Sequence, residues 1–161
     1  SLSPSMDIQV SSNVERYLWE LYGRKGSVVD EAMATFRATG RLDIGEARLD
    51  RVRRSFSGVR VDDDATLAEI RRVHDEHDLL VDPHTAVGIA AARAVPSELD
   101  VPRIVLATAH PAKFPDAVEQ ATGVRPPLPE QLADLHERPE RMTSLPNDPA
   151  VLADHLRSEL A

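Results

Sequence analysis

The feature that most constrains the fold is a short apolar run, Arg-Ile-Val-Leu-Ala, at 103–107. The run is continuous rather than alternating, which is typical of a strand buried on both faces of a parallel sheet. Shorter runs at 59–61 and 79–81 precede it, and helical patterns at 65–77 and 85–95 separate the three runs. This order predicts an α/β fold in which a few parallel strands are flanked by helices.

Three strands make a small sheet, because open sheets usually contain about four to six. The chain also begins with Ser1 rather than with methionine. We therefore expect the chain to be part of a longer protein. Such a part is expected to expose an apolar surface where the remaining strands would pack.

The apolar pattern divides the chain into four expected parts. Val14, Leu18 and Leu21 repeat at helical spacing, and two further helical patterns follow them. Leu152 and Leu156 lie in line on an expected last helix. The parts are an irregular N-terminal segment at 1–13, a helical insertion or subdomain at 14–56, an α/β core segment with ligand-side loops at 57–125, and a helical tail at 126–161.

Charge and cysteine content exclude several classes of protein. The chain carries 27 acidic and 19 basic residues, a net charge of −8, without a basic stripe, so we expect no nucleic-acid partner. It contains no cysteine, which excludes disulfides, thiolate metal sites and cysteine nucleophiles. No apolar run approaches about 20 residues and no signal-peptide pattern is present, so we expect no membrane partner and a cytoplasmic location.

Polar residues follow each expected strand, at the edge where open α/β sheets bind ligands. The three clusters are Asp-Asp-Asp at 62–64, Asp-Pro-His-Thr at 82–85 and Thr-Ala-His-Pro at 108–111. In the second cluster two interpretations stay open: Asp82, His84 or Thr85 contacts a ligand, or Asp82 and Thr85 shape a turn and cap the next helix. Thr108 ends the best strand, where its hydroxyl is placed for one hydrogen bond to a ligand, or it lies in a turn before the next helix.

The sequence contains one candidate pair of metal ligands and none of the familiar nucleophile motifs. His74 and His77 lie three residues apart on an expected helix, a spacing at which two imidazoles can bind one ion. Their neighbours are charged, which favours a solvated helix face, so we predict no metal site. The sequence has no Gly-x-Ser-x-Gly elbow and no Gly-rich phosphate loop, and we predict no catalytic residue in this chain.

Four segments resemble bacterial and fungal-type threonine synthase, in its C-terminal portion only. The motifs Ala-Thr-Ala-His-Pro-Ala-Lys-Phe-Pro and Met-Asp-Ile-Gln-Val-Ser-Ser-Asn-x-Glu-Arg are the most specific. Residues 22–60 match no family segment that we can place. The similar segments are SLSPSMDIQVSSNVERYLWEL at 1–21, LLVDPHTAVGIAAA at 79–92, IVLATAHPAKFPDAVEQATG at 104–123 and PPLPEQLADLHERPERMTSLPND at 126–148.

The resemblance implies the C-terminal part of a fold-type-II large domain that uses pyridoxal 5'-phosphate. It implies the conversion of O-phospho-L-homoserine and water to L-threonine and phosphate. In related enzymes a Ser or Thr hydroxyl after the last core strand bonds the pyridine nitrogen, and the matching residue here is Thr108. The resemblance places Ala109 and His110 in the same pocket. It also offers Ser12, Asn13, His84 and Thr85 as pocket residues.

The sequence departs from the family where the reaction is carried out. The Schiff-base lysine of the family lies in a Phe-Lys-Asp-like segment and its cofactor phosphate on a Gly-rich loop, and neither Lys25 nor Lys113 matches. The chain therefore looks like the last third of the enzyme, inactive alone, with the N-terminal part as its partner and a small molecule as substrate. Two alternatives remain open: a non-catalytic α/β interaction module, and a fragment of another fold-type-II enzyme.

Overall fold

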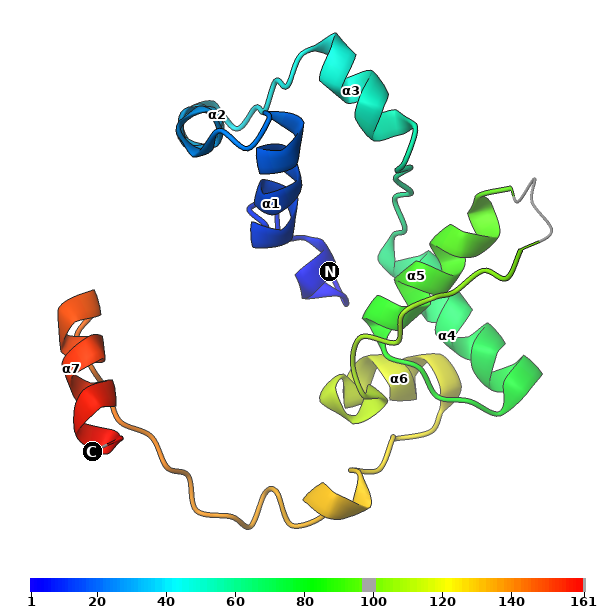
Figure 1. The fold of residues 1–161 in the computed structure, drawn as a ribbon. Coiled ribbons are helices and arrows are strands. Elements are labelled where there is room, and N and C mark those ends of the chain that lie inside the picture. Colours follow the sequence, from blue (N-terminus) through cyan, green and yellow to red (C-terminus); the bar gives the residue numbers. More distant parts are fainter. Residues whose placement is uncertain (97–100, 161) are drawn as a thin grey trace. The chain divides into compact units, whose positions relative to one another are not determined.

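The structure is a computed structural model and describes residues 1–96 and 101–160. The chain divides into two compact units, Ser1–Pro127 and Leu128–Ala161. The first unit contains two separate apolar clusters, each built from helices (Figure 1). No helix in the described part of the chain is long and apolar enough to cross a bilayer.

The first cluster is formed by α4 (Asp63–His77), α5 (Pro83–Ala94) and α6 (Pro115–Thr122). Helix α4 contacts both of the others, and the three lie together in Figure 1. The short 3-10 helix η2 (Pro111–Lys113) leads into α6. The buried side chains of this cluster are Ile70, Val73, Val81, Ala86, Val118 and Ala121.

The start of α4 differs from the sequence pattern. Thr66 and Glu69 match a capping box, but the helix begins at Asp63, two residues before the predicted start at 65, and is capped by Asp62, whose carboxylate accepts the Ala65 N–H at 3.0 Å. The Thr66 hydroxyl instead donates to the carbonyl of Asp62 at 2.8 Å. The carboxylate of Glu69 is buried and accepts from Arg93 at 2.8 Å, which ties α4 to α5.

The second cluster lies between α1 (Ser12–Leu21) and α2 (Gly26–Thr39), with α3 (Glu46–Arg53) following. Its buried residues are Leu18, Leu21, Val29 and Met33. The helices lie in the region where helices were predicted, whereas the division of the chain into four parts stays a prediction. The N-terminal residues before them include one 3-10 turn, η1 (Pro4–Met6).

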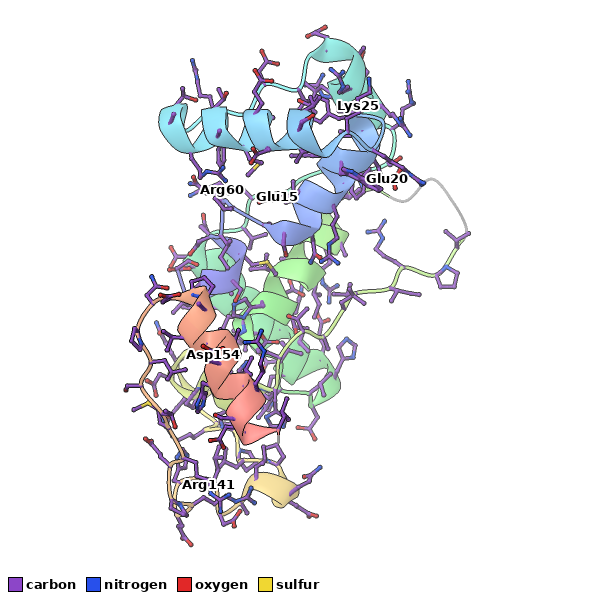
Figure 2. All side chains as sticks on the ribbon, turned by 60° about the vertical axis from the view of Figure 1, so that its left-hand side comes forward. Glu15, Glu20, Lys25, Arg60, Arg141 and Asp154 are labelled. Atoms are coloured by element: carbon purple, nitrogen blue, oxygen red, sulfur yellow. The ribbon has the colours of Figure 1, made fainter. Side chains whose placement is uncertain are left out.

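The second unit contains a 3-10 turn, η3 (Glu130–Leu132), and helix α7 (Pro149–Glu159). Asp148 caps α7 by accepting the Ala150 N–H at 2.8 Å, and Pro149 occupies its first position. Asp154, labelled in Figure 2, accepts from Arg157 at 2.6 Å on the same helix. The ion pair is exposed on both sides, so it contributes little to stability.

The strands predicted at 59–61, 79–81 and 103–107 are absent from the described residues, which are helical or irregular. Within 103–107 only one side chain is shielded from solvent. Ile104 and Leu106 are 83% and 74% exposed, whereas Val105 is half-buried. A Cβ on Gly88 would lie 3.1 Å from Val105 Cγ1, so the segment lies directly on α5.

The described residues therefore do not confirm the predicted parallel strands. A strand is defined by its ladder of backbone hydrogen bonds to a neighbouring strand. The continuous apolar run at 103–107 suits a strand, but no described segment supplies that ladder. The apolar surface expected from the small sheet is present at Ile104 and Leu106.

Candidate functional site

The candidate site starts from Asp82, the N-cap of α5. Its carboxylate is fully buried and accepts the backbone N–H groups of His84 at 2.9 Å and Thr85 at 3.4 Å. Pro83 occupies the first helical position, where its missing N–H costs nothing and its φ suits the helix. The sequence Asp-Pro-His-Thr thus begins a helix, and the capping interpretation of this cluster is confirmed.

The same carboxylate also orients the ring of His84. Asp82 Oδ1 lies 3.0 Å from His84 Nδ1, and His84 Nε2 accepts the backbone N–H of Ser5 at 3.2 Å. Because Nε2 accepts, the proton of the neutral ring belongs on Nδ1, from which it is donated to Asp82. The ring also packs on Phe114 with centroids 4.7 Å apart. His84 therefore joins η1, α5 and Phe114, which lies between η2 and α6, and has both nitrogens occupied.

Thr85 links the cap to the segment that ends at Thr108. The Thr85 hydroxyl donates to Asp82 Oδ2 in a short hydrogen bond, and Thr85 Oγ1 accepts the backbone N–H of Thr108 at 3.2 Å. Thr85 is buried, whereas Thr108 is exposed. Two residues predicted for one site from separate motifs are thus brought into direct contact.

Ala109 and His110 follow Thr108 into the turn before η2. Ala109 is half-buried and His110 is exposed. His110 caps η2, since its Nδ1 accepts the backbone N–H of Ala112 at 3.1 Å. The alternative of a turn leading into a helix is therefore correct for His110, and the Nε2 side of its ring is not used by this cap.

Ser12 and Asn13 lie on the first turn of α1 and are exposed. The carbonyl of Ser12 accepts from Arg16 at 3.3 Å, and the Asn13 side chain accepts from the same guanidinium. Among the hydrogen bonds of the described residues, none joins Ser12 or Asn13 to Thr108. The assignment of these two residues to a shared pocket stays a prediction.

The other polar clusters have local partners. Asp63 Oδ1 accepts the Leu2 N–H at 3.0 Å beside a surface cavity of about 620 Å³ that the 62–64 cluster lines. In the same cavity a hydrogen bond from the Ser1 hydroxyl lowers the pKa of Asp7. The described residues contain no group of three or more side chains placed to hold a metal ion. Lys25, labelled in Figure 2, is exposed immediately before α2.

Sequence reasoning missed one member of the site, Ser5, and left Asp82 out of its site residues. Ser5 contributes only its backbone N–H, and its partner His84 is 79 residues away in the chain. No side-chain pattern reports such a contact. The Asp-Pro pair, by contrast, is a visible capping signal, and counting the donors within three residues of Asp82 would have shown its central position.

Comparison with known proteins decides the family. A family profile described as "Threonine synthase, C-terminal" matches residues 85–156. The chain is 50% identical over 149 residues to the threonine synthase of Pseudomonas aeruginosa, covering 92% of this chain and 32% of the relative. It is 35% identical to that of Corynebacterium glutamicum, covering 99% of this chain and 34% of the relative. The chain belongs to the threonine synthase family.

Solved structures agree with this family. One is described as a threonine synthase from Brucella melitensis with bound PLP. It is 44% identical to this chain with a TM-score of 0.80. The match covers 98% of this chain and 34% of the Brucella chain. Threonine synthase from yeast is 28% identical to this chain with a TM-score of 0.76, and the match covers 99% of this chain and 36% of the yeast chain. The chain thus spans about a third of the length of these threonine synthases, consistent with a fragment of a fold-type-II enzyme.

Proposed function

We propose that this chain is the C-terminal third of a cytoplasmic, pyridoxal-phosphate-dependent lyase. The complete enzyme converts O-phospho-L-homoserine and water to L-threonine and phosphate. The observation that carries this proposal is the 50% identity over 149 residues to a threonine synthase. The Brucella relative, whose structure contains PLP, supports the choice of cofactor.

The residues around Thr108 fit the contact that the resemblance implies. The backbone of Thr108 is anchored to buried Thr85, while the Thr108 side chain is exposed and its hydroxyl is open to a ligand. A neutral hydroxyl beside a pyridine nitrogen does not hold that nitrogen as a full pyridinium, as a carboxylate would. Pyridoxal phosphate, when bound, supplies the electron sink for the reaction. Ala109 and His110 would line the same pocket.

This chain does not supply the whole cofactor site. Its two lysines, Lys25 and Lys113, lie outside a Phe-Lys-Asp-like segment, and the sequence has no Gly-rich loop for a cofactor phosphate. In this proposal both come from the N-terminal part of the enzyme. The fragment alone is therefore inactive.

The exposed face of 103–107 supports the N-terminal part as the partner. Ile104 and Leu106 are 83% and 74% exposed on one side of an extended segment whose other side lies on Gly88 of α5. Extended backbone with free N–H and C=O groups can add to a sheet edge. We propose that this segment becomes a strand in the complete enzyme. One face of the strand packs on α5, and its backbone pairs with a neighbouring strand of the N-terminal part.

A chimera tests the proposed function. The matching C-terminal third of the Pseudomonas aeruginosa enzyme is replaced by this chain, and phosphate release from O-phospho-L-homoserine is measured with added pyridoxal phosphate. We expect turnover by the chimera and none by the isolated chain. Turnover by the isolated chain would refute the division of the site, and a folded chimera that binds the cofactor without turnover would refute the assigned reaction.

A further inference from the structure

We propose that Thr85 is a positioning residue for Thr108. In this inference the Thr85 hydroxyl, oriented by the buried carboxylate of Asp82, fixes the backbone that carries the Thr108 hydroxyl. The inference rests on the proposed function, in which Thr108 contacts the pyridine nitrogen of the cofactor. Thr85 would thus act on the pyridine nitrogen through Thr108, without contacting that nitrogen itself.

The direction of each hydrogen bond follows from the donor inventory. A carboxylate only accepts, so the single proton of the Thr85 hydroxyl is donated to Asp82 Oδ2. A lone pair of Thr85 Oγ1 then remains for the backbone N–H of Thr108, which lies 3.2 Å away. The resulting chain of Thr108 N–H, Thr85 O–H and carboxylate polarises each bond in the same sense.

Burial keeps these hydrogen bonds between Thr108, Thr85 and Asp82 in one arrangement. Asp82 is fully buried and Thr85 is 4% exposed, so water does not compete for their polar atoms. Both acceptor oxygens of Asp82 are used: Oδ1 faces the backbone N–H and ring Nδ1 of His84, and Oδ2 faces the N–H and hydroxyl of Thr85. Rotation of the carboxylate would break bonds to both residues, which keeps the Thr85 oxygen aimed at Thr108.

In the chain by itself, the segment before Thr108 has little else to fix it. No ladder holds 103–107 in the described residues, and the segment approaches α5 closely where Val105 lies on Gly88. A slip of one residue would turn Thr108 to the other face of the segment. The bond from Thr108 to Thr85 therefore sets this register in the chain by itself, and in the complete enzyme it fixes Thr108 just beyond the end of the proposed strand.

The test changes only the hydroxyl of Thr85 in the active chimera. Thr85→Val keeps the shape and removes the acceptor, and Thr85→Ser keeps the acceptor. We expect Thr85→Val to weaken pyridoxal-phosphate binding, followed by cofactor absorbance, by about fivefold, as for one lost hydrogen bond. Thr85→Ser restores it. Where Thr85→Val does not fold, Thr85→Cys, a weaker acceptor of similar size, carries the same expectation.

Thr66→Val is the matched control. Thr66 is equally buried, at 1% exposure, and its hydroxyl also bonds at a helix start, to the carbonyl of Asp62 at 2.8 Å. It has no bond to Thr108, so cofactor binding should not change. In the isolated chain, amide exchange at Thr108 should become faster in Thr85→Val and stay the same in Thr66→Val, which reports the anchor without any cofactor.

A double variant separates the inference from the proposed function. If Thr85 acts through Thr108, Thr85→Val causes no further loss of cofactor affinity in a chimera that already carries Thr108→Val. A Thr108→Val variant with unchanged cofactor binding would overturn the proposed contact itself. If Thr108→Val weakens binding while Thr85→Val has no effect, or if the two effects multiply, the positioning role is refuted.

Discussion

Replacing Asp82 with alanine should destabilise the chain far more than loss of an ordinary helix cap. Removal of an N-cap side chain costs about 1 kcal/mol. Asp82→Ala also leaves His84 Nδ1–H and the Thr85 hydroxyl without their buried acceptor, at about 1 kcal/mol or more each. We therefore expect a loss of about 3 kcal/mol in the free energy of unfolding, a large part of the stability of a small domain.

Asp62→Ala provides the comparison. Asp62 also caps a helix, but it is exposed and its side chain accepts a single hydrogen bond, from the Ala65 N–H at 3.0 Å. Its loss should cost about 1 kcal/mol. The difference between the two variants, about 2 kcal/mol, measures the two side-chain bonds of Asp82.

Urea unfolding followed by circular dichroism is the suitable assay. The single tryptophan, Trp19, lies on α1 beside the other apolar cluster, so its fluorescence would report on the wrong region. The free energies of unfolding from linear extrapolation should be compared between variants whose m values, the slopes against urea concentration, are equal. Equal losses for Asp82→Ala and Asp62→Ala, within about 0.5 kcal/mol, would refute the view that one carboxylate organises the site.

Three further predictions follow from other contacts. Gly88→Ala should speed amide exchange across 103–107, because its Cβ would lie 3.1 Å from Val105; Gly26→Ala, with open space around its Cβ, should leave that exchange unchanged. Glu69→Gln should lower the free energy of unfolding in urea by about 1 to 2 kcal/mol, because a buried carboxylate loses its charge-assisted bond to Arg93. A hydrogen bond from Arg138 lowers the pKa of Asp134 from its ordinary value, so the small contribution of this exposed pair to stability is present above the unfolded pKa and is lost as the pH falls through the folded pKa. An NMR titration of this carboxyl should show its pKa rising in Arg138→Gln.

The polar cluster of 82–85 shows what a sequence can and cannot predict about a site. An Asp-Pro pair before a helical pattern is a local signal of a helix start. Asp82 does cap α5, as one of the two interpretations of this cluster predicted. The contact of Thr85 with Thr108 joins residues 23 positions apart through a backbone N–H. It depends on how the segment after α5 returns along that helix, which local patterns do not encode.

The segment 103–107 shows the same limit for the fold. Its apolar run predicts a strand buried on both faces, whereas only Val105, beside Gly88 of α5, is half-buried and Ile104 and Leu106 are exposed. Whether such a segment forms a strand depends on a hydrogen-bonded neighbour. In our proposal that neighbour comes from the N-terminal part of the enzyme, because the chain spans about a third of its relatives. The helices α4 to α6 carry their own core and were predictable.

The products of the chimera with the Pseudomonas aeruginosa enzyme test the central claim most directly. L-threonine and phosphate should be measured together, with O-phospho-L-homoserine as substrate and pyridoxal phosphate present. Our account predicts one threonine for each phosphate released, with turnover reduced in Thr108→Val. Phosphate release without threonine, or full turnover in Thr108→Val, would contradict it.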